Sequence, residues 1–330
     1  MTKIYNWGIL GPGRIAHKFA QDLLRLPNAK VHAVASRSLE RAEEFAAQYH
    51  AAFAFGSYEE LISCPYLDVI YIATPHTGHF EHTLLCLNAG IPVLCEKPLA
   101  VNLRQAQQMV YMAQNKQTFL MEAIWTRFIP THLKMWEIIN SGRIGKVLSV
   151  KADFGFKPDF QPESRLFDRR LAGGSLLDIG IYPVFLAMNI LGKPKDIQAM
   201  AHLGATGVDE EVAISFKYAS GQMAVLHSSI RFETKSEAFI YGEKGTIYLH
   251  SRWHEPSTMS LNIPGEAPEF FQFDDPGNGY HYEAEEVMRC LDAGQTESEA
   301  LPLQFSADLM DVLFSIRHLV GLQYPADEEE

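Results

Sequence analysis

The chain has 330 residues, of which 47% are hydrophobic and 21% charged, a composition typical of a folded, soluble protein with two domains. A formal net charge of −12 argues against sequence-independent nucleic-acid binding, which requires a basic surface. We find no signal peptide and no apolar run near the roughly 18 residues of a membrane span, so we expect no membrane partner. The cysteines lack CxxC spacing and fit reduced thiols in a cytoplasmic protein: Cys64, Cys86, Cys95 and Cys290.

Strand and helix patterns alternate in the first part of the chain. Strands are expected at residues 4–10, 30–35, 52–55, 69–73, 93–95 and 118–122, and helices at 14–26, 39–49, 58–62, 79–89 and 103–114. The strand Val69–Ala73 is apolar throughout, as in a parallel sheet covered on both faces. Repeated βα units of this kind predict a doubly wound parallel sheet, the Rossmann arrangement.

The pattern changes after residue 125. Strands are expected at 146–156, 196–202, 212–218, 222–230, 238–241 and 246–250, and helices at 130–141, 184–191, 280–293 and 306–319. These segments predict an open, mostly antiparallel sheet with helices on one face. The fold class is therefore α/β plus α+β. We expect a Rossmann domain at 1–123 and a substrate-binding and dimerisation domain at 124–330, and we leave open that a C-terminal helix packs back on the first domain.

The first strand runs into a glycine-rich turn that opens the first helix. The turn reads Gly11-Pro12-Gly13-Arg14-Ile15-Ala16, which matches the GxGxxA pattern of dinucleotide-binding turns. Gly11 allows the tight turn, and Gly13 lets a pyrophosphate approach the backbone. The N-terminus of the helix, at Arg14 and Ile15, would stabilise the phosphate charge. The alternative is a glycine-rich turn without a ligand.

The end of the second strand bears on the choice of nicotinamide cofactor. In NAD-binding proteins an acid about 20 residues beyond the turn usually holds the ribose 2′-hydroxyl. Here the strand ends in Ser36-Arg37-Ser38, without an acid at its tip. Arg37 can pair with a 2′-phosphate, and Ser36 and Arg41 can add contacts. The sequence therefore favours NADP, and NAD remains possible.

The fourth strand is followed by Thr74-Pro75-His76, which should lie at the same edge of the sheet. We expect these residues and His79 to contribute to the nicotinamide half of the cofactor site. The spacing of His76, His79 and His82 also resembles a metal-ligand pattern. No acid or cysteine is grouped with them in the sequence. We therefore predict no metal and favour a helix-capping or surface role for the histidines.

A lysine follows the fifth strand, in the sequence Glu96-Lys97-Pro98. Its position puts an ionisable amine at the carboxyl edge of the sheet, where open α/β sheets bind ligands. Glu96 and Lys97 are therefore candidate cofactor contacts. A lone lysine followed by proline could also be a solvated turn residue.

The motifs in order resemble those of the glucose–fructose oxidoreductase/inositol dehydrogenase/MocA (Gfo/Idh/MocA) family. They are the glycine-rich turn, Glu96-Lys97-Pro98, and a stretch in the second domain that reads GGSLLDIGIYP over residues 173–183. The stretches at 94–98 and 121–128 resemble more closely the branch of dimeric dihydrodiol dehydrogenases, which also oxidise D-xylose with NADP. The resemblance covers nearly the whole chain.

The resemblance implies roles for residues that match the family's motifs. Lys97 matches the catalytic lysine, and Pro98 matches a proline that is often cis. Asp178 and Tyr182 match a DxxxH-like motif; many members have histidine where this chain and the dihydrodiol dehydrogenase branch have tyrosine. The resemblance also implies a homodimer that forms through the second-domain sheet.

The expected reaction is hydride transfer between the CH–OH carbon of a carbohydrate or cyclic vicinal diol and the nicotinamide. Lys97 and Tyr182 would share the acid–base work, and the sequence does not choose between them. Asp178 would orient substrate hydroxyls or hold Lys97, unless it only caps a helix. Candidate substrate contacts, for which core packing is an equal alternative, are Trp125, Arg127, Phe154 and Tyr280. A non-catalytic NADP-binding sensor is the alternative function, and the intact Lys97 argues against it.

Overall fold

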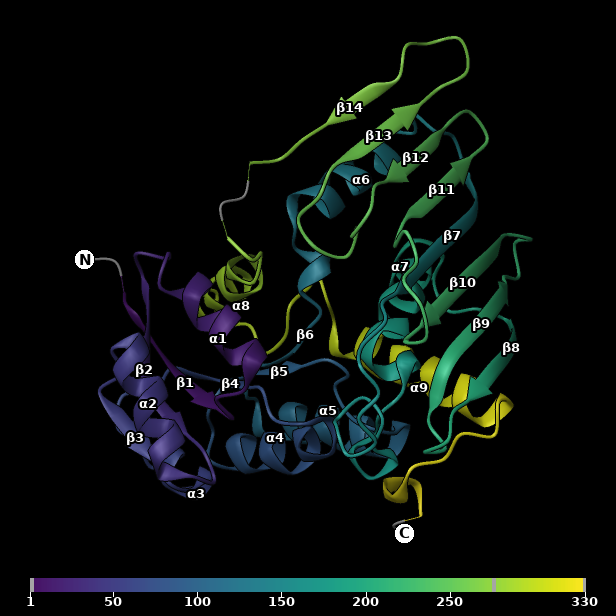
Figure 1. Cartoon of the computed structure of the whole chain (residues 1–330). Coiled ribbons are helices and arrows are strands. Elements are labelled where there is room, and N and C mark those ends of the chain that lie inside the picture. The colour runs from purple at the N-terminus through teal and green to yellow at the C-terminus, as the bar shows by residue number, and fades with distance from the viewer. Residues whose placement is uncertain (1–2, 275–276, 329–330) are drawn as a thin grey trace. The chain divides into compact units, whose positions relative to one another are not determined.

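The computed structural model of the chain describes residues 3–274 and 277–328. They form two compact units, whose elements are labelled in Figure 1. The first unit comprises Met1–Trp125 and Pro276–Ala307, and the second comprises Thr126–Asp275 and Asp308–Glu330. The sequence predicted one boundary, between residues 123 and 124. It also left open that a C-terminal helix packs back on the first domain, and in the structure a late segment that includes the helix His281–Asp292 belongs to the first unit.

The first unit contains a six-stranded parallel sheet in the order β3-β2-β1-β4-β5-β6. This order confirms the predicted Rossmann fold, and it reverses between β1 and β4, where such sheets bind ligands. The strands are β1 (Tyr5–Leu10), β2 (Ala29–Ala35), β3 (Phe53–Phe55), β4 (Val69–Ile72), β5 (Val93–Glu96) and β6 (Leu120–Ala123). The helices between them are α1 (Arg14–Leu23), α2 (Leu39–Tyr49), α3 (Tyr58–Leu61), α4 (His79–Asn88) and α5 (Leu103–Lys116).

Side-chain caps fix where several of these helices begin. The Ser38 hydroxyl accepts the N–H of Arg41 at the start of α2, and the Asn102 side chain accepts the N–H of Gln105 at the start of α5. Such caps satisfy backbone donors that have no partner inside the helix. The strand β4 is buried at every position, which agrees with the apolar run that predicted it.

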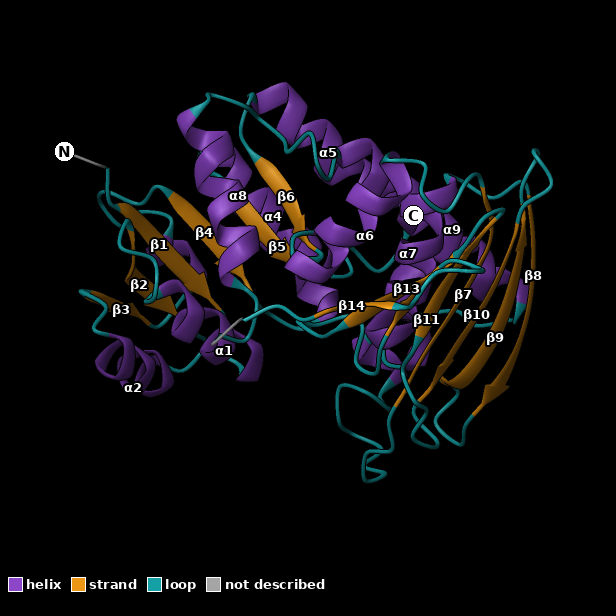
Figure 2. Ribbon diagram, turned by 90° about the horizontal axis from the view of Figure 1, so that it is seen from above, coloured by secondary structure: helices purple, strands orange, loops and turns teal. Residues whose placement is uncertain are grey.

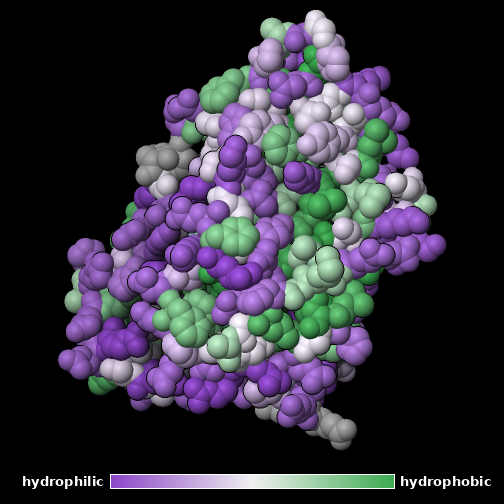
Figure 3. Space-filling view, turned by 45° about the vertical axis from the view of Figure 1, so that its right-hand side comes forward, coloured by the Kyte–Doolittle hydropathy of each residue, from purple (hydrophilic) through white to green (hydrophobic). Residues whose placement is uncertain are grey.

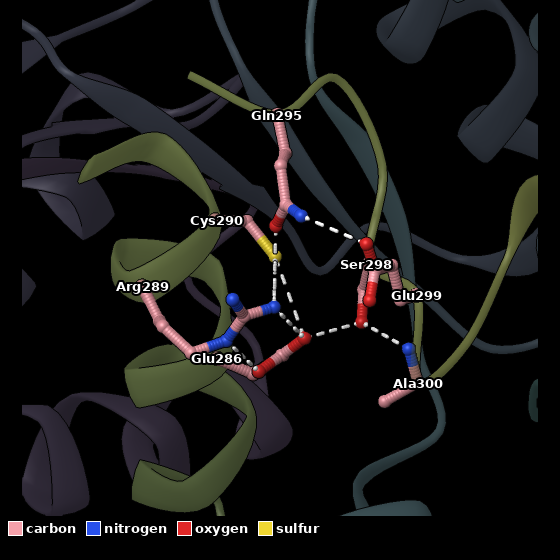
Figure 4. Close-up of polar contacts among 7 residues, drawn as sticks. All are labelled: Glu286, Arg289, Cys290, Gln295, Ser298, Glu299 and Ala300. Carbon is pink, nitrogen blue, oxygen red and sulfur yellow. Dashed lines mark hydrogen bonds and ion pairs between the residues drawn. The ribbon is translucent and has the colours of Figure 1, made fainter. Parts of the chain in front are cut away.

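A helix from late in the chain, α8 (His281–Asp292), packs beside α1 in the first unit. Figure 4 shows how the stretch after it is held. Glu286 of α8 accepts hydrogen bonds from the Arg289 guanidinium at 2.8 and 2.9 Å and from the Ser298 hydroxyl. The Leu120 N–H at the start of β6 donates to the carbonyl of Thr296 at 3.2 Å. The bonds around Glu286 hold the segment together, and the bond from Leu120 ties it to the parallel sheet of the first unit.

The second unit contains an eight-stranded sheet in the order β14-β13-β12-β11-β7-β10-β9-β8. Only β7 and β10 pair in parallel, so the predicted mostly antiparallel sheet is confirmed. The strands are β7 (Val147–Gly155), β8 (Asp196–Leu203), β9 (Asp209–Lys217), β10 (Met223–Ser229), β11 (Ala238–Gly242), β12 (Thr246–Leu249), β13 (Met259–Asn262) and β14 (Glu269–Phe271). The sequence did not predict β13 and β14.

Helices cover one face of this sheet, as Figure 2 shows for α6 (Pro130–Asn140) and α7 (Ile181–Leu191). The last long helix is α9 (Leu303–Leu319), most of which belongs to the second unit. The stretch Arg169–Leu191, which includes α7, is long and apolar enough to cross a membrane by composition alone. However, 94% of its most apolar 18-residue window is buried inside the protein, as in the core helix of a globular unit.

The other face of the sheet, which we call the open face, carries exposed apolar side chains. Strand register places on it Met200 of β8, which is 77% exposed, and Phe270 of β14, which is 61% exposed. Met223, Val225 and Tyr241 lie on the same face and are also exposed. Figure 3 turns the β8–β10 side of Figure 1 forward and shows hydrophobic residues gathered among hydrophilic ones. Sheet faces of this kind usually meet a partner surface.

Candidate active site

The glycine-rich turn after β1 has the geometry that a dinucleotide requires. Gly11 has φ +92°, and a Cβ at this position would lie 2.8 Å from Cγ2 of Thr74 in the loop after β4. Gly13 precedes α1, and no side chain caps this helix. The first N–H groups of α1, beginning at Arg14 and Ile15, can therefore meet an anion. Both the tight backbone at Gly11 and the uncapped N–H groups of α1 therefore suit a pyrophosphate.

The end of β2 presents positive charge next to this turn. Ser36 is buried, and its hydroxyl accepts the N–H of Ser38 at 3.3 Å. Arg37 and Arg41 are exposed, and an Arg41 Nη donates to the Pro12 carbonyl at 3.5 Å. Burial raises the pKa of Tyr58, and the charges of Arg37 and Arg41 oppose that rise. Both guanidinium groups therefore lie near one ring, close to the glycine-rich turn.

The loop after β4 is tied to the loop after β5 by His79, the first residue of α4. The His79 ring is fully buried, with Nδ1 at 2.7 Å from the Pro98 carbonyl and Nε2 at 2.9 Å from the Thr74 carbonyl. Burial lowers the pKa of His79, and these two hydrogen bonds oppose the change. The surface or capping role favoured from the sequence is therefore wrong for His79, because its ring links two loops inside the unit.

The neighbouring histidines occupy other positions at this edge. His76 begins the short 3-10 turn His76–Gly78 after Pro75, and its ring lies 5.8 Å from that of His79. Nδ1 of His82 lies 3.0 Å from the Thr74 hydroxyl. Over the described parts of the chain, no group of three or more His, Cys, Asp or Glu residues is arranged to hold a metal ion.

Lys97 follows directly after β5, at the same edge as the glycine-rich turn and the Thr74 loop. Its backbone N–H donates to Oε2 of Glu96 at 3.2 Å, and Oε1 of Glu96 accepts the hydroxyl of Tyr71. The Lys97–Pro98 peptide bond is cis, as the family resemblance implied. The side chain of Glu96 is thus engaged within the protein, and it lies inside the unit at 7% exposure.

Glu122 of β6 is a buried acid near Lys97 that the sequence did not single out. One of its carboxylate oxygens accepts the N–H of Leu99 at 2.8 Å. Burial raises its pKa to about 7, with Glu96 adding to the rise and Ser306, Leu99 and Lys97 opposing it. The sequence placed this acid only within the stretch 121–128, which resembles the dihydrodiol dehydrogenase branch, and gave it no role of its own.

Two predicted substrate contacts lie together in the first unit. The rings of Trp125 and Tyr280 stack with centroids 4.4 Å apart and planes inclined by 9°. Both side chains are 5% exposed. Stacked aromatic pairs contribute to packing, and their rings also suit the flat face of a cyclic substrate.

In the second unit, Asp178 lies in a π-helical turn, Leu176–Gly180, just before α7. Such turns are uncommon and are frequent at functional sites. Asp178 is 6% exposed and forms an ion pair with Arg165 at 2.7 Å. Arg165 was not anticipated from the sequence. A carboxylate held by a guanidinium is more typical of a positioned, charged group than of a simple helix cap.

Tyr182, in the first turn of α7, belongs to an aromatic cluster. Its ring centroid lies 5.8 Å from that of Phe154 and 5.3 Å from that of His254. The Phe154 and His254 rings stack at 3.9 Å. The structure therefore brings the predicted Tyr182 and Phe154 together and adds His254, which lies in a loop where the sequence gave no signal.

Arg127, the remaining predicted substrate contact, lies in the second unit near His132. Burial and the charge of Arg127 lower the pKa of His132 in α6 to about 3. Arg127 is half-buried beside this core histidine.

Comparisons with known proteins agree with these features. Residues 5–124 match the model of the Gfo/Idh/MocA oxidoreductase family, NAD-binding Rossmann fold, and residues 132–248 match the family's C-terminal domain. A trans-1,2-dihydrobenzene-1,2-diol dehydrogenase from Danio rerio is 40% identical over 98% of this chain and 99% of its own, and one from Homo sapiens is 38% identical with the same coverage. The chain belongs to the Gfo/Idh/MocA family.

Solved structures agree with the fold. An aldose–aldose oxidoreductase from Caulobacter crescentus has a TM-score of 0.88 at 22% identity, covering 97% of this chain and 98% of its own. A 3-ketoreductase from Actinomadura kijaniata, in complex with NADP and TDP-benzene, has a TM-score of 0.85 at 22% identity, with 96% and 98% coverage. Together with the family match, the glycine-rich turn makes this Gfo/Idh/MocA protein an NAD(P)-dependent dehydrogenase.

Proposed function

We propose that this Gfo/Idh/MocA protein is an NADP-preferring dehydrogenase that oxidises a cyclic vicinal diol or a sugar. The observation that carries the proposal is Lys97, which follows β5 at the sheet edge that also holds the glycine-rich turn. Relatives about 40% identical over nearly the full length are named for a cyclic trans-diol, which supports this substrate class. No observation favours a non-catalytic sensor.

The chemistry divides between the cofactor and the chain. The bound nicotinamide would accept the hydride from the CH–OH carbon. Lys97 would handle the hydroxyl proton, as general base in oxidation and general acid in reduction, and Tyr182 is the other candidate for this role from the family resemblance. Asp178, charged and paired with Arg165, would orient the substrate hydroxyls.

The cofactor contacts follow from the first unit. Gly11, Gly13 and the start of α1 would hold the pyrophosphate. Arg37 and Arg41 would pair with a 2′-phosphate, which supports NADP over NAD. Nicotinamide-side contacts would come from Thr74, Pro75, His76, His79, Glu96 and Lys97.

Aromatic groups in each unit supply candidate substrate contacts. Phe154 and His254 lie beside Tyr182, and Trp125 stacks on Tyr280. Aromatic faces suit an unsaturated ring or the apolar face of a sugar. Arg127 is the remaining candidate, and its half-buried guanidinium could donate to a substrate hydroxyl.

We further propose a cytoplasmic homodimer that forms through the open face. The exposed apolar side chains on that face support a self-complementary contact between two sheets. The buried, free cysteines fit a reducing compartment. Imaging of a tagged chain in its own cell would test the compartment, and a signal in a membrane-bound organelle would contradict it.

The test is turnover by the purified protein with NADP and with NAD on trans-1,2-dihydrobenzene-1,2-diol, D-xylose and other aldoses. We expect Lys97→Ala to lower kcat by about 10²–10⁴-fold while NADPH binding, followed by fluorescence, is kept. Tyr182→Phe should lower kcat in the same direction. NADPH binding without turnover of any compound would contradict the substrate class, and failure to bind either nucleotide would contradict the proposal as a whole.

A further inference from the structure

A cluster of buried ionisable side chains begins at Glu96, next to Lys97, and the function proposed above uses only Glu96 of this cluster, as a cofactor contact. Its members come from α1, β4, β5 and α8 of the first unit and are Asp22, Tyr71, Glu96 and Glu283. Each is at most 7% exposed. Neighbouring acids in such surroundings cannot all be ionised, because burial and like charges both disfavour the charged form. The contacts of each side chain indicate which of these acids are ionised and which one holds a proton.

Glu96 is the ionised member next to Lys97. One of its oxygens accepts the Tyr71 hydroxyl, and the other accepts the Lys97 N–H at 3.2 Å. A carboxyl group that accepts at both oxygens is stabilised as the carboxylate. Burial, together with the charges of Glu96 and Glu283, raises the pKa of Tyr71 well above its usual value, so its hydroxyl remains a donor.

Asp22 of α1 is also ionised. Its carboxylate accepts the N–H groups of Asn278 and Tyr280, at 2.9 and 2.8 Å, and lies 3.7 Å from Nδ1 of His281. Burial pushes the pKa of Asp22 upward, but the nearby His281 ring and the hydrogen bonds from Asn278 and Tyr280 outweigh it and lower the pKa overall. A carboxylate with this many donors keeps its charge at neutral pH.

Glu283 differs from both. It is the third residue of α8, a position where a glutamate often accepts the backbone N–H of the residue just before the helix. Here that residue is Tyr280, and its N–H donates to Asp22 instead. Glu283 is fully buried, and among the described residues neither of its carboxyl oxygens has a hydrogen-bond partner. Burial, with Glu96 and Asp22 as like charges, raises the pKa of Glu283 well above its usual value.

We propose that Tyr71, Glu96 and Glu283 set the charge beside Lys97, with Glu96 holding the negative charge and Glu283 holding a proton. The proposal rests on the acid–base role of Lys97 proposed above. In oxidation the substrate O–H bond breaks and its proton forms an N–H bond on the Lys97 amine, while the C–H electron pair leaves as hydride to the nicotinamide. The Glu96 carboxylate stabilises the resulting ammonium. A second carboxylate, at Glu283, would hold Lys97 as ammonium before the reaction, and Lys97 could then not accept the proton.

These residues act through Lys97 and are positioning residues. Lys97 also faces Glu122 of β6 and His79 of α4, and Tyr71 faces Tyr280. The variants below leave those groups unchanged.

The first test is the pH profile of kcat/KM for oxidation in Tyr71→Phe, Glu283→Gln and the control Glu285→Gln, an exposed residue of the same helix. Without the Tyr71 hydroxyl, Glu96 takes up a proton more readily, which reduces the negative charge beside Lys97. We expect the midpoint of the acidic limb to move down by about half a pH unit in Tyr71→Phe. Glutamine mimics the protonated acid, so Glu283→Gln and Glu285→Gln should keep the wild-type midpoint. A shifted midpoint in Glu283→Gln, or an unshifted one in Tyr71→Phe, would overturn the proposal.

The second test reads the proton on Glu283 without turnover. The infrared difference spectrum between wild type and Glu283→Gln at neutral pH should contain the C=O stretch of a protonated carboxylic acid, and the spectrum for Glu285→Gln should contain a carboxylate band instead. A carboxylate band for Glu283 would contradict the assignment even if Lys97 is catalytic. Conversely, an active Lys97→Ala variant would contradict the role of Lys97 and leave the infrared result for Glu283 standing.

Discussion

Arg37 is the single residue on which the proposed preference for NADP depends most. It is exposed at the end of β2, near the glycine-rich turn, where an acid would favour NAD. We expect Arg37→Ala to raise the KM for NADP about 10–100-fold, because charge-assisted hydrogen bonds to a phosphate are lost. The KM for NAD should change little. Steady-state kinetics with both cofactors checks this, with exposed Arg104→Ala of α5 as control. An equal loss with both cofactors would argue against a 2′-phosphate contact.

The sequence predicted the role of a residue well where that residue belongs to a local motif. It did not predict the role where the residue acts together with others that become neighbours only in the folded chain. Gly11 was predicted from GxGxxA, and its positive φ agrees with that reading. Glu283 lies in a first helical turn and His254 in a loop, and the residues that surround them in the fold are far away in the chain. His79 was misjudged because its acceptors, the carbonyls of Thr74 and Pro98, become neighbours only when two strand ends meet at one sheet edge.

At the scale of elements, the π-helical turn that carries Asp178 is held by a buried acid, Asp209, at the start of β9. The Asp209 carboxylate accepts the Ser175 hydroxyl at 2.9 Å and the Leu176 N–H at 2.6 Å. A Cβ on Gly174, which has φ +121°, would lie 2.0 Å from its other oxygen. The acid and the turn are therefore packed in direct contact.

The raised pKa of Asp209 leads us to expect that the stability of the protein depends on pH. Burial raises its pKa to about 7 from 3.8, so between these values the folded protein binds a proton that the unfolded chain does not. The stabilisation that this protonated group contributes is therefore greatest below about pH 4. As the pH rises to about 7, the free energy of unfolding should fall by on the order of a few kcal/mol. Asp209→Asn lacks this titration. Thermal melts across that range should show wild-type stability declining relative to the variant, and parallel curves would contradict this account.

The order of the elements was predictable because hydrophobic period and turn residues are local properties. The strands β13 and β14 were missed for a physical reason. They are short, Met259–Asn262 and Glu269–Phe271, and they lie at the edge of the sheet, where pairing with β12 and with each other defines them. Sequence pattern alone carries little signal for such strands.

At the scale of the whole molecule, the open face predicts how copies assemble. Val225 lies on it at 49% exposure, opposite Lys151 of β7 and Ser215 of β9. A charge at a desolvated contact is costly, so Val225→Glu should convert the proposed dimer to monomer with little change in the melting temperature. Analytical ultracentrifugation measures this. The control is Tyr111→Glu, at an exposed aromatic on α5 in the first unit, which should keep the wild-type mass. A dimer that survives Val225→Glu would place the contact elsewhere.

The central claim is direct hydride transfer from a diol or sugar carbon to NADP, assisted by Lys97. The measurement that tests it most directly uses trans-1,2-dihydrobenzene-1,2-diol or D-xylose with deuterium at the carbon to be oxidised. Mass spectrometry of the NADPH formed should show one deuterium per molecule with the wild-type protein, at a rate that falls by about 10²–10⁴-fold with Lys97→Ala. NADPH formed without deuterium, or at an undiminished rate in the variant, would contradict the account.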